Sequence, residues 1–304
     1  MEKKGLYISL DHVFDMDSLE MDKTSNGIIK KIANQFYCFK DYGFDMDIFF
    51  PYKNRSRYLH AIVRRLPLSG FISYGKNYIR NAKDYSFIYL RKPWFMNSDT
   101  PRFLKKMKKK NSKIKIVVEY PTFDSSSSKG EVNHLNMWPL YIKDKVALKK
   151  ICKLIDRVLT FSKDKEILGV ETIQTCNAIN PTQTKKINYV KTDEKEIHLI
   201  ACSSMAFWHG FDRIIEGLGN YYERENVPYK IVFHLIGDGE ELNNYRGMVR
   251  NRHLEEVVLV YGYKFGKELD DIYDICDIAV DSLGRHRSGV FYNSSLKGKE
   301  YLAK

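Results

Sequence analysis

The chain has 304 residues, of which 43% are hydrophobic and 29% are charged. This apolar content excludes a disordered chain, and the length predicts two domains. Fifty lysines and arginines against 38 acidic residues give a net charge of +12. That charge favours anionic partners, such as phosphates, nucleic acid or an acidic membrane surface, without choosing among them.

The first half of the chain alternates short β-rich runs with longer amphipathic stretches. Strands are predicted at 5–10, 44–50, 87–90, 113–120, 157–162 and 172–177. Helical patterns lie between several of them, and this alternation is typical of a parallel α/β sheet. Residues 1–180 are therefore predicted to form one Rossmann-like domain.

The first helical pattern begins after TSNG (24–27) and ends at Gly43. Its apolar residues share one face, namely Ile28, Ile29, Ile32, Ala33, Phe36 and Phe39. The free N–H groups at such a helix start can hold an anion, which makes Asn26 and Gly27 candidate site residues. An ordinary capped turn is the alternative.

A basic segment, RFLKKMKKKNSKIKI (102–116), follows later in the first half. It places Phe103, Leu104 and Met107 on one side of a lysine-rich helix start, a pattern compatible with peripheral contact to anionic lipid. The alternative is a solvated helix leading into a strand. Nucleic acid is not expected, because no basic motif interleaved with aromatic residues is present.

A polar stretch with a proline and mixed charge separates the two halves, and we predict a linker at 181–194. The strand rhythm then restarts in residues 195–304, with strands predicted at 197–203, 230–237, 257–262 and 277–283. A second, shorter Rossmann-like domain is the expected result.

Two strand-to-turn-to-helix passages stand out in the second half. ACSSMAFWHGFDRIIEGL (201–218) predicts a strand end, a loop and a helix with Ile214, Ile215 and Leu218 facing inward. HLIGDGEEL (234–242) predicts another strand that turns sharply into a helix. Ligands bind at the carboxyl ends of parallel strands, so these loops are candidate binding loops, although either alone fits a plain βα turn.

The last residues, NSSLKGKEYLAK (293–304), read as the opening turns of a helix. Ser294 and Ser295 can cap it, and its free N–H groups and Lys297 suit a diphosphate. Helical side chains lean toward the N-terminus, which brings the Glu300 carboxylate near a sugar edge. A surface helix with solvated lysines is the alternative.

Together these passages resemble the family 4 glycosyltransferases of the GT-B fold, over residues 156–304 and more loosely before them. DRVLTFS followed by CNAIN resembles a passage of that family, with Ala178 and Asn180 where glycine and aspartate are usual. WHGFDRIIEGL is similar to its K-G-x-D-x-L-I-x-A helix start, and LIGDGEEL to its G-x-G-x-x turn. EYPTF (119–123) resembles a strand end of capsule and cell-envelope polysaccharide members.

The resemblance implies an α/β protein of the GT-B fold, with two Rossmann-like domains facing a cleft. It also leads us to expect a truncated, incomplete second domain, because the family usually continues past the last helix with further elements. Such a chain is expected to bind nucleotide weakly, to transfer sugar slowly or not at all, and to self-associate.

Donor-binding positions are carried over from the family by motif. They are Ser203, His209, Gly210, Arg213, Gly237, Tyr261, Gly262, Tyr263, Ser294, Ser295, Leu296, Lys297 and Glu300. Glu300 falls on the family's second glutamate, which contacts the donor ribose, whereas Tyr292 occupies the place of the first. Ser203 and His209 stand where an arginine and a lysine commonly contact the diphosphate, and a histidine is only partly protonated near neutral pH.

The implied activity is retaining hexosyl transfer from a UDP- or GDP-linked sugar to a glycan or polyprenyl-linked acceptor in surface polysaccharide assembly. No protein nucleophile, cofactor or metal is expected. Glu119 is the catalytic candidate, as a group that orients the acceptor hydroxyl, and Asn26 and Gly27 fall on the acceptor side. A buried structural carboxylate paired with a lysine is the alternative for Glu119.

Several other patterns are excluded as sites. Asp45 and Asp47 form an Asp-x-Asp, but they alternate with apolar residues and fit the polar face of a half-buried strand. Eight histidines show no metal-ligand spacing. Five scattered cysteines, without a signal peptide or a long apolar stretch, favour a cytoplasmic protein, peripheral at most to the inner face of the cell membrane.

The main alternative is a non-catalytic protein that binds a nucleotide sugar or helps assembly, motivated by Tyr292, Ser203 and His209. A nucleotide-dependent oxidoreductase is disfavoured, because no GxGxxG follows the first strand.

Overall fold

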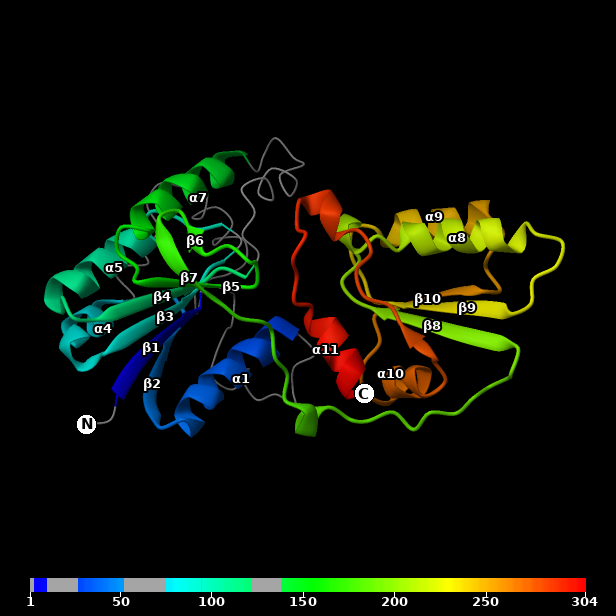
Figure 1. Ribbon diagram of the computed structural model, residues 1–304, viewed down its shortest axis with the longest axis horizontal. Helices are drawn as coiled ribbons and strands as arrows, with labels where there is room; N and C mark the ends of the chain where they lie inside the picture. The colour runs from blue at the N-terminus through cyan, green and yellow to red at the C-terminus, as the bar shows by residue number, and fades with distance from the viewer. Residues whose placement is uncertain (1–2, 10–26, 52–74, 94, 122–137) are drawn as a thin grey trace. The chain divides into compact units, whose positions relative to one another are not determined.

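The computed structural model describes residues 3–9, 27–51, 75–93, 95–121 and 138–304 (Figure 1). The chain divides into two compact units, Met1–Cys176 (unit 1) and Asn177–Lys304 (unit 2). The segment predicted as a linker makes contacts within unit 2. In that segment, Ile187 packs against an apolar cluster that contains Ile200, Ile236 and Tyr273, and the N–H of Val190 donates to the carbonyl oxygen of Asp274 at 2.7 Å.

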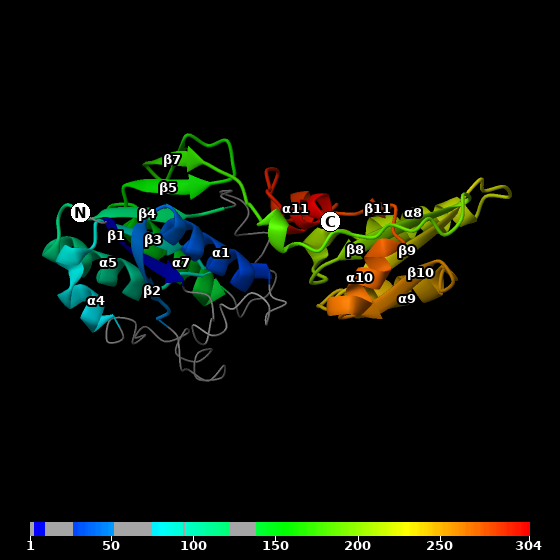
Figure 2. The same ribbon diagram turned by 90° about the horizontal axis from the view of Figure 1, so that it is seen from below.

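Unit 1 is built on a seven-stranded sheet in the order β2-β1-β3-β4-β5-β7-β6. The strands are β1 Lys3–Ser9, β2 Phe44–Phe49, β3 Phe87–Arg91, β4 Lys115–Glu119, β5 Arg157–Thr160, β6 Glu166–Ile167 and β7 Val170–Gln174. All neighbours are parallel except β6 and β7, and Figure 2 shows β5 and β7 side by side. The six predicted strands are confirmed, and the two-residue β6 is additional.

Helices cover both faces of this sheet. They are α1 Gly27–Asp41, α4 Lys76–Arg80, α5 Asp99–Lys110 and α7 Trp138–Ile151, with a 3-10 turn η3 at Ala82–Asp84. On one face, Ile32, Ala33 and Phe36 of α1 are buried against Tyr7 and Tyr89. The predicted apolar face of α1 is therefore confirmed where the structure describes it.

The opposite face of the sheet corrects the interpretation of the basic segment. Phe103, Leu104 and Met107 of α5 are completely buried among Leu6, Ile88 and other sheet residues. They form the core of unit 1, so they are not available to a lipid surface. The outward side of α5 carries only its charged residues.

Unit 2 contains a parallel four-stranded sheet in the order β10-β9-β8-β11. The strands are β8 Glu196–Cys202, β9 Lys230–Ile236, β10 Val258–Gly262 and β11 Ile278–Ala279. The helices are α8 Asp212–Tyr222, α9 Leu242–Asn251, α10 Gly266–Asp274 and α11 Leu296–Ala303, with 3-10 turns at Pro181–Gln183, Phe207–His209 and Arg285–Ser288. Figure 1 shows α8 and α9 on one face of this sheet and α10 on the other.

The core of unit 2 follows the predicted inward faces. Ile215 and Leu218 of α8 are buried, and Ile214 packs against the same cluster. The four predicted strands are confirmed, although only Ile278–Ala279 of the last one pairs with β8. Both units are therefore parallel α/β layers of the Rossmann kind, as the sequence predicts.

Candidate functional site

The carboxyl edge of the unit 2 sheet brings together loops that are distant in the sequence. The N–H of Gly237 donates to the carbonyl oxygen of Gly262 at 2.7 Å, and the N–H of Ser203 donates to that of Ile236 at 3.0 Å. The loops that follow β8, β9 and β10 therefore meet at one edge. The predicted positions Ser203, Gly237 and Gly262 lie side by side there, and the buried Ser203 Oγ has no hydrogen-bond partner in unit 2.

Two glycines allow this close approach. Gly237 and Gly239 have φ angles of +130° and +155°, and a Cβ on Gly237 would lie 1.8 Å from the carbonyl oxygen of Ser203. A Cβ on Gly239 would lie 2.5 Å from the carbonyl oxygen of Met205. Neither position accepts a side chain, so the backbone of the β9–α9 turn is left bare at the edge where a ligand would approach.

His209 does not supply positive charge to this edge. Its side chain is buried, stacks on Phe211 at 5.7 Å, and its Nδ1 accepts a hydrogen bond from the N–H of Ala206 at 3.1 Å. Burial, with the charges of Lys297 and Arg285, lowers the pKa of His209 to about 3. The partial protonation expected from sequence is therefore wrong, because desolvation keeps the imidazole neutral at pH 7.

We expect His209 to make unit 2 sensitive to acid. Its pKa is near 6.5 in the unfolded chain and about 3 when folded, so protonation favours unfolding. Stability is complete above pH 6.5 and falls by about 2 kcal/mol by pH 5. In His209→Asn, the amide oxygen can accept from the N–H of Ala206 without titrating. The part of the stability loss that comes from His209 should therefore disappear.

Urea unfolding at pH 7.5 and pH 5, followed by hydrogen exchange in β8 and β9, measures the difference. His234 is also buried, and burial lowers its pKa to about 4. It is present in both proteins, so its contribution cancels. Equal losses of stability in the wild type and His209→Asn would contradict the prediction.

Gly210 and Arg213 keep the loop after His209 against the segment that follows β11. The backbone of Gly210 lies so close to Gly284 that an added Cβ would come within 2.6 Å of the Gly284 nitrogen. Arg213 NH1 donates to the carbonyl oxygen of Leu283 at 2.8 Å. Its hydrogen bond goes to a backbone carbonyl rather than to a carboxylate, so the guanidinium charge is not neutralised by that bond.

The start of α11 is capped by Ser295, as predicted. Ser295 Oγ accepts from the N–H of Gly298 at 3.3 Å and donates to Asp281 at 3.0 Å. Ser294 is not a cap, because its Oγ accepts from the N–H of Asn177 at 2.9 Å. The helix itself begins at Leu296.

Lys297 and Glu300 extend from this capped helix. Lys297 Nζ donates to Ser282 Oγ at 3.0 Å and lies 3.4 Å from Asp281, and burial lowers the pKa of Lys297. One turn later, the hydroxyl of Tyr301 accepts from the N–H of Cys202 at 3.0 Å. This bond fixes α11 at the carboxyl end of β8, beside which Glu300 is half-buried.

The two tyrosines predicted near a nucleotide base differ in their surroundings. The Tyr261 hydroxyl pairs with His234 Nδ1 at 2.8 Å, and His234 Nε2 pairs with His198 Nδ1 at 2.8 Å. Tyr261 is thus part of a buried polar chain across β8, β9 and β10. Tyr263 is 56% exposed beside Phe265, with ring centroids 6.1 Å apart, so it is the more accessible aromatic.

The catalytic candidate in unit 1 is buried. Glu119 is 1% exposed at the end of β4, and its carboxylate is ion-paired with Lys31 of α1. Tyr89 donates to it at 2.5 Å, Gln35 donates at 3.0 Å, and Arg91 lies 3.8 Å away. Both carboxylate oxygens already have partners. This favours a structural carboxylate paired with a lysine over a group that orients the acceptor hydroxyl.

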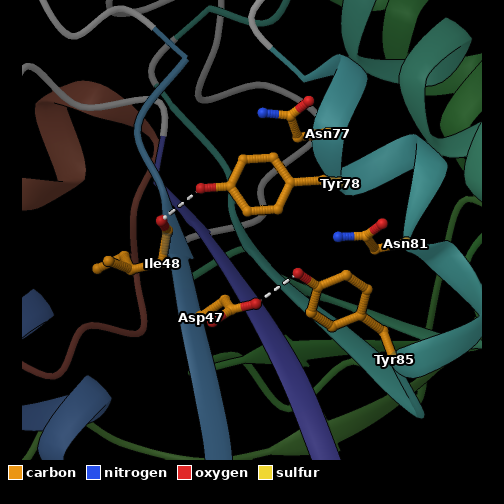
Figure 3. A pocket seen from close by; sticks show the side chains of 6 residues that line it. All are labelled: Asp47, Ile48, Asn77, Tyr78, Asn81 and Tyr85. Carbon is orange, nitrogen blue, oxygen red and sulfur yellow. Dashed lines mark hydrogen bonds between the residues drawn. The ribbon is translucent and has the colours of Figure 1, made fainter.

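A hollow of about 400 Å³ lies elsewhere in unit 1, between β2 and α4 (Figure 3). Its lining comprises Asp47, Ile48, Asn77, Tyr78, Asn81 and Tyr85. Tyr85 donates to the Asp47 carboxylate at 2.5 Å, and Tyr78 donates to the carbonyl oxygen of Ile48 at 3.1 Å. None of the predicted donor-binding residues lines this hollow.

Asp45 and Asp47 behave as the polar face of a half-buried strand, as predicted. Lys4 Nζ lies 3.5 Å from Asp45 and 3.2 Å from Asp47, so one lysine offsets one of the two negative charges. Over the described ranges, no three His, Cys, Asp or Glu side chains gather as metal ligands. Nor does any helix in these ranges have the length and apolar character to cross a bilayer.

The acceptor-side candidates are only partly visible. Gly27 is the first residue of α1, whereas Asn26 lies outside the described residues. The EYPTF passage likewise continues past Pro121 into residues outside them.

Comparison with known proteins gives the fold a name. No protein-family model and no curated protein sequence matches the chain. Among solved structures, the lipopolysaccharide outer core galactosyltransferase WaaB in its apo form is similar at 14% identity, with a TM-score of 0.55 over 92% of this chain and 74% of that one. The trehalose-6-phosphate synthase OtsA is similar at 12% identity, with a TM-score of 0.56 over 98% of this chain and 81% of that one.

A further trehalose-6-phosphate synthase, studied with bisubstrate glycomimetics for glycosyl transfer with retention, has 11% identity and a TM-score of 0.53, over 98% of this chain and 80% of that one. These likenesses show that the chain has the GT-B fold, with two Rossmann-like domains. At such low identities they show the fold alone.

Proposed function

We propose that the chain is a glycosyltransferase that binds a UDP- or GDP-linked sugar through unit 2. One observation carries the proposal. The bare glycine turn at Gly237 and the ends of β8 and β10 lie at one edge of a parallel sheet, and the capped start of α11 contacts Asp281 and Ser282, which follow β11 of the same sheet. Such an edge, with free N–H groups of a helix start, suits a diphosphate.

The finer parts of the proposal concern the reaction. We propose hexosyl transfer with retention to a glycan or polyprenyl-linked acceptor in surface polysaccharide assembly. The α11 start, Lys297 and Arg213 stabilise the charge on the departing diphosphate, which accepts the proton of the acceptor hydroxyl. No metal takes part, and the five free cysteines suit a reducing, cytoplasmic setting.

The second candidate function is a nucleotide-sugar-binding protein without transfer activity. It is favoured by the neutral His209 and by Ser203, which together leave less positive charge near a departing diphosphate than an arginine and a lysine would. A glycosyl-transfer assay with radiolabelled UDP- and GDP-sugars separates the two functions. Binding without turnover supports the second.

Nucleotide binding is the direct test of the donor site. We expect UDP or GDP to bind the wild type in calorimetry, with the same affinity in EDTA. Glu300→Ala should weaken binding by about 1 to 3 kcal/mol, because a charge-assisted hydrogen bond to the ribose is lost. The matched control is Glu225→Ala, an exposed glutamate before β9, at the opposite edge of the sheet.

Unchanged affinity in Glu300→Ala would remove Glu300 from the site. Absence of binding by any nucleoside diphosphate would refute the donor-site proposal as a whole. Strict dependence on magnesium or manganese would refute the metal-free part of it.

A further inference from the structure

The outward face of α7 carries apolar side chains that are not part of the core of unit 1. Trp138, Ile142 and Val146 are 47%, 57% and 44% exposed, and they follow one another at intervals of four residues. Residues at this spacing share one face of a helix. The opposite face is already buried in unit 1, through Tyr141, Asp144, Ala147, Leu148 and Ile151. We call the three exposed side chains the α7 stripe.

The exposed charged residues of α7 itself have one sign. The exposed charged positions of α7 are Lys145, Lys149 and Lys150, and the exposed Lys153 follows. The one acidic residue of the helix, Asp144, is buried and lies 3.3 Å from Lys92 Nζ. Repulsion by carboxylates is therefore absent from the exposed surface of α7.

The neighbouring helix extends this basic surface. Helix α5 packs against α7, and Figure 1 shows the two in the same layer. Its acidic residue, Asp99, is buried and lies 3.0 Å from Arg102. Its apolar residues are in the core, so its exposed side chains are basic, namely Arg102, Lys105, Lys106, Lys109 and Lys110.

We propose that the α7 stripe docks on an anionic lipid bilayer. The three apolar side chains enter the headgroup region, and the lysines of α7 and α5 contact lipid phosphates. The positive charge beside the apolar side chains favours an anionic bilayer over other partners. A second copy of the chain would bring its own lysines against these, and nucleic acid offers no apolar layer for the tryptophan, isoleucine and valine.

This surface extends the proposed function, because a bilayer is where a lipid-linked acceptor would be met. Vesicle binding requires no sugar nucleotide, so the two proposals fail separately. Lost vesicle binding with intact UDP binding would overturn the docking surface alone. Lost nucleotide binding with intact vesicle binding would overturn the donor site alone.

The test is co-sedimentation of the full chain with vesicles. Phosphatidylcholine vesicles containing phosphatidylglycerol should bind the wild type, with an affinity that falls as salt rises. Pure phosphatidylcholine vesicles should bind far less. The triple variant Lys145→Gln/Lys149→Gln/Lys150→Gln should bind about a hundredfold more weakly, since each lysine near an anionic surface contributes about fivefold. Ile142→Ser/Val146→Ser should lose about tenfold.

The matched control has the same change in charge on other elements of unit 1. Lys76, Lys83 and Lys113 are exposed, and Lys76→Gln/Lys83→Gln/Lys113→Gln should bind within about threefold of the wild type. An equal loss in this control would show that only net charge matters and would overturn the proposal. Unchanged binding of Ile142→Ser/Val146→Ser, or a dimer in ultracentrifugation that this variant abolishes, would overturn it too.

Discussion

Replacing Gly237 by alanine is expected to destabilise unit 2 by about 3 to 5 kcal/mol and to abolish nucleotide binding. The residue has a φ of +130°, which side-chain-bearing residues rarely adopt. An added Cβ would also lie 1.8 Å from the carbonyl oxygen of Ser203. Neither strand can move away, because Gly237 and Ser203 are both hydrogen-bonded across the sheet.

Gly217 provides the matched control. It lies on the exposed side of α8, and a Cβ added there meets no atom within 4 Å. Gly217→Ala should stabilise unit 2 by about 0.5 to 1 kcal/mol, since alanine loses less backbone entropy in a helix. Urea unfolding with hydrogen exchange in β9 measures both variants. A Gly237→Ala protein as stable as the wild type would disprove the packing described for this turn.

The parts of the fold that depend on local pattern could be predicted from the sequence. Strands such as β1, β3 and β9 are mostly buried apolar runs, and the α1 and α8 faces repeat at helical spacing. The glycines of LIGDGEEL indicated a sharp turn at the end of β9, which the structure confirms. Local chemistry also predicted a serine cap at Ser294 and Ser295, because a serine before an apolar helical pattern satisfies free N–H groups, and the structure confirms Ser295.

The candidate site was less predictable, since its electrostatics depend on contacts between distant residues. The neutral state of His209 follows from burial against Phe211 and from Lys297, which is 88 positions later. The sequence could not distinguish Ser294 from Ser295. The difference comes from Asn177, which lies 117 positions before Ser294 in the sequence and donates its N–H to the Ser294 hydroxyl. The hydrogen bonds from His198 through His234 to Tyr261 depend on the register of three strands. Alternating burial alone does not fix that register.

Exposure of apolar side chains is another feature that the sequence left open. The lysine-rich α5 has a single apolar side, and packing used that side for the core. Helix α7 has apolar residues on two sides, so one set remains outside after the other is buried. Only the placement of both helices on the sheet decides which apolar residues stay exposed.

Replacing Lys31 by methionine is expected to destabilise unit 1 by about 3 kcal/mol at pH 7, because the Glu119 carboxylate stays buried without its nearest cation. Lys31 and Glu119 are 7% and 1% exposed, so water cannot replace the lost charge. Tyr89 and Gln35 would still donate to the carboxylate. The matched control is Lys30→Met on the same helix, where the partly exposed lysine allows a change below about 0.5 kcal/mol.

The pH dependence of this difference identifies the carboxylate as its source. Burial alone would raise the pKa of Glu119, but Lys31 and Arg91 outweigh burial and lower it below the ordinary value. In the wild type the pair therefore contributes its full stability above about pH 4.3 and loses it as pH falls further. In Lys31→Met the carboxyl group is expected to take up a proton at higher pH, because burial is less opposed. The deficit relative to the wild type should therefore shrink between pH 7 and pH 5. Hydrogen exchange in β4 and α1 measures it, and a deficit independent of pH would mean that lost packing by Lys31, not an unpaired Glu119, causes the destabilisation.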